Sequence, residues 1–273
     1  MDALPPADAR RTKRGFTLTE LLVVIAIVVL LIAVLLPTLA LARRSSQTTG
    51  CASNLQQLGR GLALYLNDFP ERMPQAFEPG TTTIVGTLFG GARGSLPAFG
   101  INQLGAAGRP LNSYVGVRDP LPDAGAERVE VDVFQSPADR GARNLPGLGQ
   151  VASFYELLGS SYAMNDHAPD NDPAVELIPT LVPQGGGRMP IVRSPSITVA
   201  FASHTIYNYD DGNDRQSLWY GATETDPLAN VCMLDGSVMT RVGVEETSPG
   251  QPAVATRDYT FLPRRDWLEK LGL

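Results

Sequence analysis

The chain of 273 residues has few of the side chains on which most enzymatic chemistry depends. It contains two histidines, His167 and His204, and two cysteines, Cys51 and Cys232. The serine-hydrolase elbow Gly-x-Ser-x-Gly, the zinc-protease motif His-Glu-x-x-His and the phosphate-binding Gly-x4-Gly-Lys are all absent from the sequence. His204 follows Ser203, but adjacency in the chain is not the geometry of a catalytic triad. We therefore expect no enzymatic activity.

Positive charge is also scarce. The sequence has 22 lysines and arginines against 28 aspartates and glutamates, for a net charge of −6. A nucleic-acid-binding protein would need a basic face, and the two cysteines lack the close spacing of a zinc site. The composition therefore gives no reason to expect bound nucleic acid or structural zinc.

One long stretch near the N-terminus lacks charge altogether. Residues Leu21 to Ala42 are predominantly apolar, with Pro37 as the interruption, and a membrane-spanning helix needs about 20 such residues. Four basic residues precede the stretch, and the positive-inside tendency places them in the cytoplasm: Arg10, Arg11, Lys13 and Arg14. The sequence thus predicts one membrane span, with the N-terminus in the cytoplasm and the rest of the chain on the outer side.

Glu20 stands at the start of this apolar run. A carboxylate at the edge of an apolar helix costs several kcal/mol unless it is neutralised or paired. Its presence suggests a functional partner.

The order of these features resembles that of type IV prepilins and type II secretion pseudopilins. The shared elements are a basic leader, Gly15, Phe16, the segment Thr17-Leu18-Thr19-Glu20 and an aliphatic run. The resemblance implies that a prepilin peptidase cleaves between Gly15 and Phe16 and that the new N-terminal Phe16 is N-methylated. Glu20 is then the fifth mature residue and Pro37 the twenty-second, as is typical of the family. The mature chain would carry 18 basic and 26 acidic residues, or −8.

The resemblance also implies partners for assembly. In such filaments the N-terminal ammonium of one subunit is thought to meet the glutamate of its neighbour, so Glu20 and Pro37 are the expected assembly residues. The expected partners are the peptidase and methyltransferase, other pilin or pseudopilin subunits and the membrane. The resemblance implies an inner-membrane protein whose residues 70–273 lie in the periplasm or, in a filament, outside the cell.

Two ordinary alternatives explain part of the N-terminal pattern. A cleaved signal peptide has an apolar region of roughly 7 to 15 residues that ends at small residues, whereas this run is longer and begins at Glu20. A plain signal anchor explains the length and the basic leader. It explains neither the Gly15-Phe16 step nor the glutamate.

The chain is expected to have three parts: a leader at residues 1–15, a helix at 16–69 and a globular domain at 70–273. Beyond Arg44 an apolar residue recurs every three or four positions, which predicts an amphipathic helix ending near Asp68-Phe69-Pro70: Leu55, Leu58, Leu62, Tyr65, Leu66 and Phe69. The fold class we expect is α+β and pilin-like, with the outer half of the helix packed on a mostly antiparallel sheet.

Patterns in the remaining chain predict shorter elements. Residues 71–127 are rich in Gly and Pro and indicate loops with short strands or helical turns. Alternating valines predict a half-buried strand at 129–133, and a second strand is expected at 197–201. The clearest hairpin pairs 230–234 with 237–242 around Asp235-Gly236, because Asp-Gly suits a two-residue turn. Residues 264–271 could form a short helix.

A second resemblance covers the globular part. Four segments are similar to those of large bacterial pilin-like families, including the one catalogued as DUF1559: Cys51–Gly59, Phe134–Arg140, Ser160–Asn165 and Val231–Val238. The chain departs from that pattern twice. Ser136 replaces a cysteine in the Phe-x-Cys-Pro segment, and Thr225 replaces the histidine of the His-x9-Asp-Gly segment. With Ser136 in place, a disulfide would have to join Cys51 to Cys232, and the sequence leaves open whether these two approach each other.

One acidic turn is a weak candidate for calcium. Asp210, Asp211 and Asp214 surround Gly212 and Asn213, and calcium takes six to eight oxygen ligands from flexible loops. The order of residues is not that of an EF-hand, and a solvated acidic turn without a ligand is the ordinary alternative. Trp219 and Tyr220, just after it, are expected in the core.

The sequence therefore predicts a structural subunit of a type IV pilus or a type II secretion pseudopilus. The alternative is a monomeric, membrane-anchored envelope protein whose residues 70–273 bind a ligand.

Overall fold

The computed structural model describes residues 16–116, 128–145, 147–166, 181–183, 186–208, 216–223, 226–248, 251–252 and 256–263. The chain divides between Arg43 and Arg44 into two compact units. The first unit contributes the beginning of a long helix, and the second contains the rest of that helix and all the strands.

The long helix, α1, runs from Leu18 to Asp68 without a break at Pro37. Its 51 residues correspond to about 77 Å of helix. The helix ends where the sequence predicts, since Phe69 N–H still donates to Tyr65 O at 2.8 Å and Pro70 follows. The predicted apolar stripe is buried at Leu55, Leu58, Leu62 and Tyr65, whereas the last member, Phe69, is exposed.

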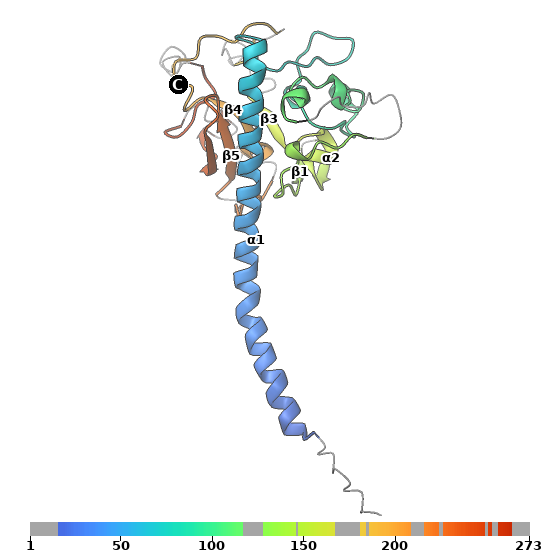
Figure 1. Ribbon diagram of the computed structural model, residues 1–273, viewed down its shortest axis with the longest axis vertical. Coiled ribbons are helices and arrows are strands. Elements are labelled where there is room, and N and C mark those ends of the chain that lie inside the picture. Colours follow the sequence, from blue (N-terminus) through green and yellow to red (C-terminus); the bar gives the residue numbers. More distant parts are fainter. Residues whose placement is uncertain are drawn as a thin grey trace, which may run out of the picture. The chain divides into compact units, whose positions relative to one another are not determined.

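The main sheet has four antiparallel strands in the order β3-β4-β5-β6 (Figure 1). They are β3 (Tyr162–Met164), β4 (Val199–Ser203), β5 (Leu228–Met233) and β6 (Val238–Gly243). β5 and β6 form the predicted hairpin, and Gly236 supplies the positive φ of 85° that its turn requires. The strand predicted at 197–201 is present with its bounds shifted by two residues.

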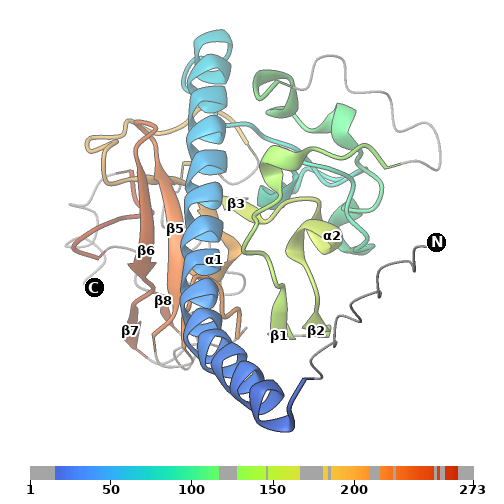
Figure 2. The ribbon, with the colours of Figure 1, turned by 60° about the horizontal axis from the view of Figure 1, so that its bottom comes forward.

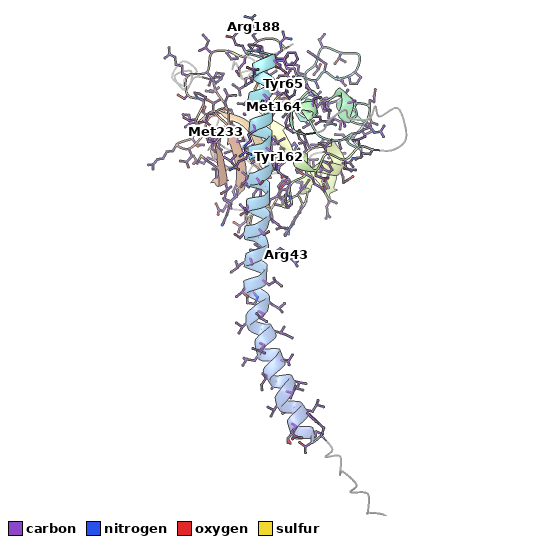
Figure 3. All side chains as sticks on the ribbon, viewed as in Figure 1. Arg43, Tyr65, Tyr162, Met164, Arg188 and Met233 are labelled. Atoms are coloured by element: carbon purple, nitrogen blue, oxygen red, sulfur yellow. The ribbon has the colours of Figure 1, made fainter. Side chains whose placement is uncertain are left out.

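Every residue of β4 and β5 is buried, on both faces of the sheet, and most of these residues are apolar. One face packs with α1 through Tyr162, Met164, Phe201 and Cys232, and Figure 3 marks Tyr162 and Met164 on β3. The opposite face forms a second core, whose members include Ala163, Ala202, Val231, Met233 and Tyr259. The predicted α+β, pilin-like arrangement of a long helix on antiparallel strands is confirmed.

Close contact between α1 and the β5–β6 hairpin depends on glycine (Figure 2). A Cβ added at Gly59 would lie 2.9 Å from Cys232 Sγ and 3.2 Å from Gly236 Cα. A Cβ at Gly61 would lie 2.5 Å from Val115 Cγ1 on the other side of the helix. The absence of side chains at these positions allows the helix to approach its neighbours closely.

The other elements are short. The loops predicted from residue 71 onward are confirmed as far as residue 116; they contain 3-10 turns at Gly86–Phe89, Ala98–Gly100, Ala106–Gly108 and Asn112–Tyr114. Farther along lie β1 (Ala142–Leu145), β2 (Gly149–Val151), α2 (Phe154–Leu158), a 3-10 turn at His204–Tyr207, β7 (Glu246–Ser248) and β8 (Gln251–Pro252). Residues 117–127 and the helix suggested at 264–271 lie outside the described residues.

The prediction of a strand at 129–133 is wrong. Residues 128–131 are irregular, and a 3-10 turn covers Asp132–Phe134. The N–H of Val131 donates to the Tyr155 hydroxyl at 2.8 Å instead of to a neighbouring strand. The alternation of valines marks inward and outward side chains here, but a side chain rather than a β-ladder satisfies the backbone.

Candidate processing and assembly site

The first turn of α1 is closed by a reciprocal pair of hydrogen bonds. The backbone N–H and the hydroxyl of Thr17 each donate to Glu20 Oε2 at 2.8 Å, and Glu20 N–H donates to Thr17 Oγ1 at 3.2 Å. This arrangement is a capping box, in which a Thr and a Glu three residues later satisfy donors at the helix start. The helix therefore begins at Leu18, and Phe16 and Thr17 precede it.

The capping box gives Glu20 a partner within its own chain. The role of Thr17 is not among the predictions from the sequence, although the spacing Thr-x-x-Glu is the signal that identifies such a box. The second carboxylate oxygen, Oε1, makes no hydrogen bond with the described residues. Phe16 is 74 % exposed, and Gly15, on the other side of the expected cleavage point, lies outside the described residues.

The apolar run that follows is exposed along its whole length. From Leu21 to Leu41 its large side chains are 47–67 % exposed, and the mean hydropathy of its most apolar 18-residue window is 3.3. By length and composition this part of α1 can cross a membrane. Pro37 lies inside it, and Thr38 donates to the carbonyl of Leu35 at 2.8 Å.

The two cysteines are separate free thiols. Cys51 Sγ lies 2.9 Å from the hydroxyl of Tyr220, whereas Cys232 Sγ lies against Gly59. Cys51 and Gly59 are eight residues apart on α1, or about 12 Å along the helix. A disulfide requires Cβ atoms about 4 Å apart, so the structure does not bring the candidate pair together. Burial raises the pKa of the Cys232 thiol to about 12.

Cys51 belongs to a buried polar cluster built from the segments with motif resemblance. The Tyr220 hydroxyl makes a hydrogen bond with Cys51, and the buried residues Ser136 and Ser203 lie near it. Tyr162 is fully buried beside the same thiol. Burial raises the pKa of both tyrosines well above its ordinary value, so both remain neutral. Tyr220 makes a hydrogen bond with Cys51, whereas the buried hydroxyl of Tyr162 has no hydrogen-bond partner among the described residues.

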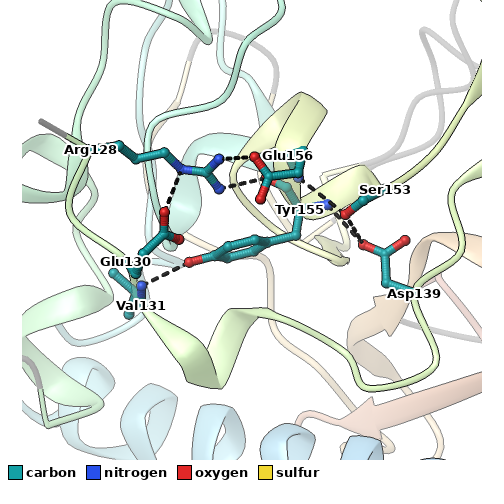
Figure 4. A network of polar contacts seen from close by, with 7 residues as sticks. All are labelled: Arg128, Glu130, Val131, Asp139, Ser153, Tyr155 and Glu156. Carbon is teal, nitrogen blue, oxygen red and sulfur yellow. Dashed lines mark hydrogen bonds and ion pairs between the residues drawn. The ribbon is translucent and has the colours of Figure 1, made fainter. Parts of the chain in front are cut away.

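Asp139 joins two of these segments through Ser161, and Figure 4 shows its contacts at the start of α2. Its carboxylate accepts from the hydroxyls of Ser161 at 2.7 Å and Ser153 at 3.0 Å. It also accepts from three backbone N–H groups at 2.8–3.1 Å, those of Gly141, Phe154 and Tyr155. One side chain thus fixes the start of α2, the turn before β1 and the start of β3.

A second polar group lies beside it (Figure 4). Arg128 forms ion pairs with Glu130 and Glu156, and its guanidinium lies 4.8 Å from the centre of the Tyr155 ring. Burial raises the pKa of Tyr155, whose hydroxyl accepts from Val131 N–H. These contacts hold the irregular segment 128–131 in place, which is a structural role.

The remaining candidates do not form a site within the described residues. His204 is buried and stacks on Phe154 with ring centres 4.6 Å apart. Trp219 and Tyr220 are buried, as predicted. His167, Thr225 and the calcium candidates Asp210, Asp211 and Asp214 lie outside the described residues. No group of three or more potential metal ligands occurs in the part of the chain that the structure describes.

The comparison with known families identifies the N-terminal segment. Residues 10–36 match the family described as the prokaryotic N-terminal methylation motif, which is 27 of 273 residues. No curated protein and no solved structure matches the chain. The matched range contains the capping box and most of the apolar run. The chain is therefore prepilin-like at its N-terminal end, and the motif implies processing by a prepilin peptidase.

Proposed function

We propose that the protein is a structural subunit of a type IV pilus or a type II secretion pseudopilus. The observation that carries this proposal is the coincidence of the methylation motif with an exposed apolar helix that continues into a folded unit. Cleavage after Gly15 gives a mature chain that begins at Phe16. Before assembly this chain crosses the inner membrane, with its N-terminus in the cytoplasm and its globular part in the periplasm.

Assembly through α1 follows from the exposure of its apolar side chains. When a subunit leaves the lipid, these side chains become exposed to water unless they pack against the helices of other subunits. Association therefore replaces the apolar environment of the lipid by that of neighbouring helices. Glu20 fixes the register, because a carboxylate in such surroundings needs a cationic partner. The ammonium of Phe16 on a neighbouring subunit is the group we propose for it, with Oε1 as the acceptor.

Within this class we propose the large pilin-like group known as DUF1559. Support comes from contacts between the segments that resemble it. Asn54 donates to the carbonyl of Gln135 at 2.8 Å, and Ser161 Oγ accepts from Ser136 N–H at 3.0 Å. The changes at Ser136 and Thr225 set this chain apart from the usual pattern of the group.

Cysteine crosslinking in the native envelope tests assembly. A Leu30→Cys variant places a thiol on the exposed part of α1, while the two native cysteines are buried. Oxidation of intact cells should give disulfide-linked dimers joined through position 30, since each chain has one accessible thiol, and the same variant in a Glu20→Ala background should give far fewer. Monomer alone from Leu30→Cys, at native expression, would contradict assembly and favour the tethered binding protein.

A further inference from the structure

We propose that Arg43 and Arg44 bind the phosphate groups of anionic lipids at the outer surface of the membrane that α1 crosses. The proposal rests on the proposed function, because it requires that residues 21–42 span the bilayer. It adds a ligand class and two binding residues to that function.

The position of the two arginines fits the dimensions of a bilayer. The uncharged run Leu21–Ala42 has 22 residues, or about 33 Å of helix, and the hydrocarbon core is about 30 Å thick. With Glu20 at the inner boundary, Arg43 is the first residue beyond the core on the outer side. Phosphate groups lie at that depth, and a long arginine side chain reaches them.

Among the described residues, no acidic side chain neutralises either arginine. Arg43 and Arg44 are exposed, and Figure 3 shows Arg43 extending away from the helix axis. Neither residue has an ion pair or a side-chain hydrogen bond among the described residues, whereas Arg128 and Arg188 are paired with glutamates. An atom added as Cβ at Gly221 would lie 3.8 Å from Arg44 Nη1, so a residue without a side chain lies close to this guanidinium.

The chemistry of the guanidinium selects the ligand. Its planar donors match the oxygens of a phosphate and form two parallel, charge-assisted hydrogen bonds with it. Two such groups in succession, next to the apolar run, favour a lipid phosphate over a free one, since the lipid is held at the required depth. Attraction to an anionic surface adds about fivefold in affinity for each arginine.

Processing makes this pair more important. Cleavage after Gly15 would remove Arg10, Arg11, Lys13 and Arg14, the cations before the apolar run. The cations that then flank the run are the Phe16 ammonium on one side and the two arginines on the other. Lipid binding by the mature chain should therefore depend on Arg43 and Arg44.

Native mass spectrometry of the mature chain tests the proposal. The protein is extracted from membranes in a non-ionic detergent and offered equal amounts of phosphatidylglycerol and phosphatidylcholine, with millimolar inorganic phosphate present. The unaltered chain should retain phosphatidylglycerol preferentially. The double variant Arg43→Gln/Arg44→Gln should lose about 30-fold of that retention. The double variant Arg43→Lys/Arg44→Lys should keep part of this retention. Lysine preserves the positive charge, but it cannot form the two parallel hydrogen bonds that a guanidinium makes with a phosphate.

Arg60→Gln is the matched control, since Arg60 is exposed on the same helix but lies 17 residues beyond Arg43. Its lipid retention should equal that of the unaltered chain. Equal retention of phosphatidylglycerol by the double glutamine variant would overturn the proposal. The proposal would also be overturned if inorganic phosphate displaced all of the bound lipid. Crosslinks from Arg43 and Arg44 to acidic residues of a second chain would overturn it as well. Failure of the protein to fractionate with membranes would instead overturn the proposed function.

Discussion

Thr17 and Glu20 hold each other at the start of α1. The hydroxyl of Thr17 donates to Glu20 Oε2 at 2.8 Å, and the N–H of Glu20 returns a bond to that hydroxyl at 3.2 Å. Glu20 therefore has a fixed orientation before any second subunit is present. The carboxylate serves two purposes in our account: one oxygen closes its own helix, and the other is left for a neighbour.

Replacing Glu20 by Ala should leave cleavage after Gly15 largely intact but should impair filament assembly. The reason is that the methyl group cannot accept from the ammonium of a neighbouring subunit. Processing is measured by intact mass and assembly by shearing and crosslinking. Glu20→Gln is the matched control for shape, and it should also assemble poorly, because it lacks the charge. Normal filaments from Glu20→Ala would count against the proposed pairing.

Replacing Asp139 by Asn should destabilise the folded unit by about 2 to 4 kcal/mol, since an amide oxygen cannot replace a carboxylate that accepts five hydrogen bonds. For a unit of this size the melting temperature should fall by about 5 to 12 °C. Thermal unfolding of the purified mature chain measures the change. Asp132→Asn, at an exposed position, should leave the melting temperature nearly unchanged. Equal melting of both variants would show that Asp139 is not the structural centre we describe.

Replacing Gly59 by Val should separate α1 from the β5–β6 hairpin. The new Cβ would lie 2.9 Å from Cys232 Sγ and 3.2 Å from Gly236 Cα, and overpacking of this kind costs about 1 to 3 kcal/mol. Chemical unfolding of the mature chain in detergent reports the loss. Gly243→Ala is the control, because no atom lies within 4 Å of a Cβ at that position. Unchanged stability of Gly59→Val would mean that the close approach is not needed.

Stability should fall as the pH rises above about 9. The pKa of Cys232 rises from 9.0 to about 12 on folding because the thiol is buried. The unfolded chain thus releases this proton at a lower pH than the folded chain, so alkali favours unfolding. The slope for one group approaches 1.4 kcal/mol per pH unit. Tyr162 and Tyr220 act in the same direction, starting above pH 10. Between pH 9 and 10 the unfolding free energy of Cys232→Ala should fall less steeply with pH than that of the unaltered chain. An equal slope for the two proteins would show that Cys232 is not the group responsible.

The sequence predicts the elements whose signals are local. The three- and four-residue spacing from Leu55 to Tyr65 predicts the packed half of α1, and Asp235-Gly236 predicts the hairpin. The three-residue spacing of Thr17 and Glu20 is that of the capping box. In each case the interacting groups are a few residues apart in the chain.

Prediction fails where partners are distant in the chain. The strand expected at 129–133 is absent because the Tyr155 hydroxyl takes the N–H of Val131. The role of Asp139 depends on Ser153 and Ser161, 14 and 22 residues away. No sequence pattern shows that Cys232 packs against Gly59 rather than against Cys51. These contacts are set by how the sheet and α1 come together.

Intact-mass and N-terminal analysis of the protein from its native envelope tests the central claim most directly. A chain that begins at N-methylated Phe16 is the result that the account predicts. The only other amine of that chain is Lys270, so amine labelling gives a simple check on the state of the N-terminus. A chain that still begins at Met1 or Asp2, in cells with an active prepilin peptidase, would contradict the account and make an anchored binding protein the better explanation.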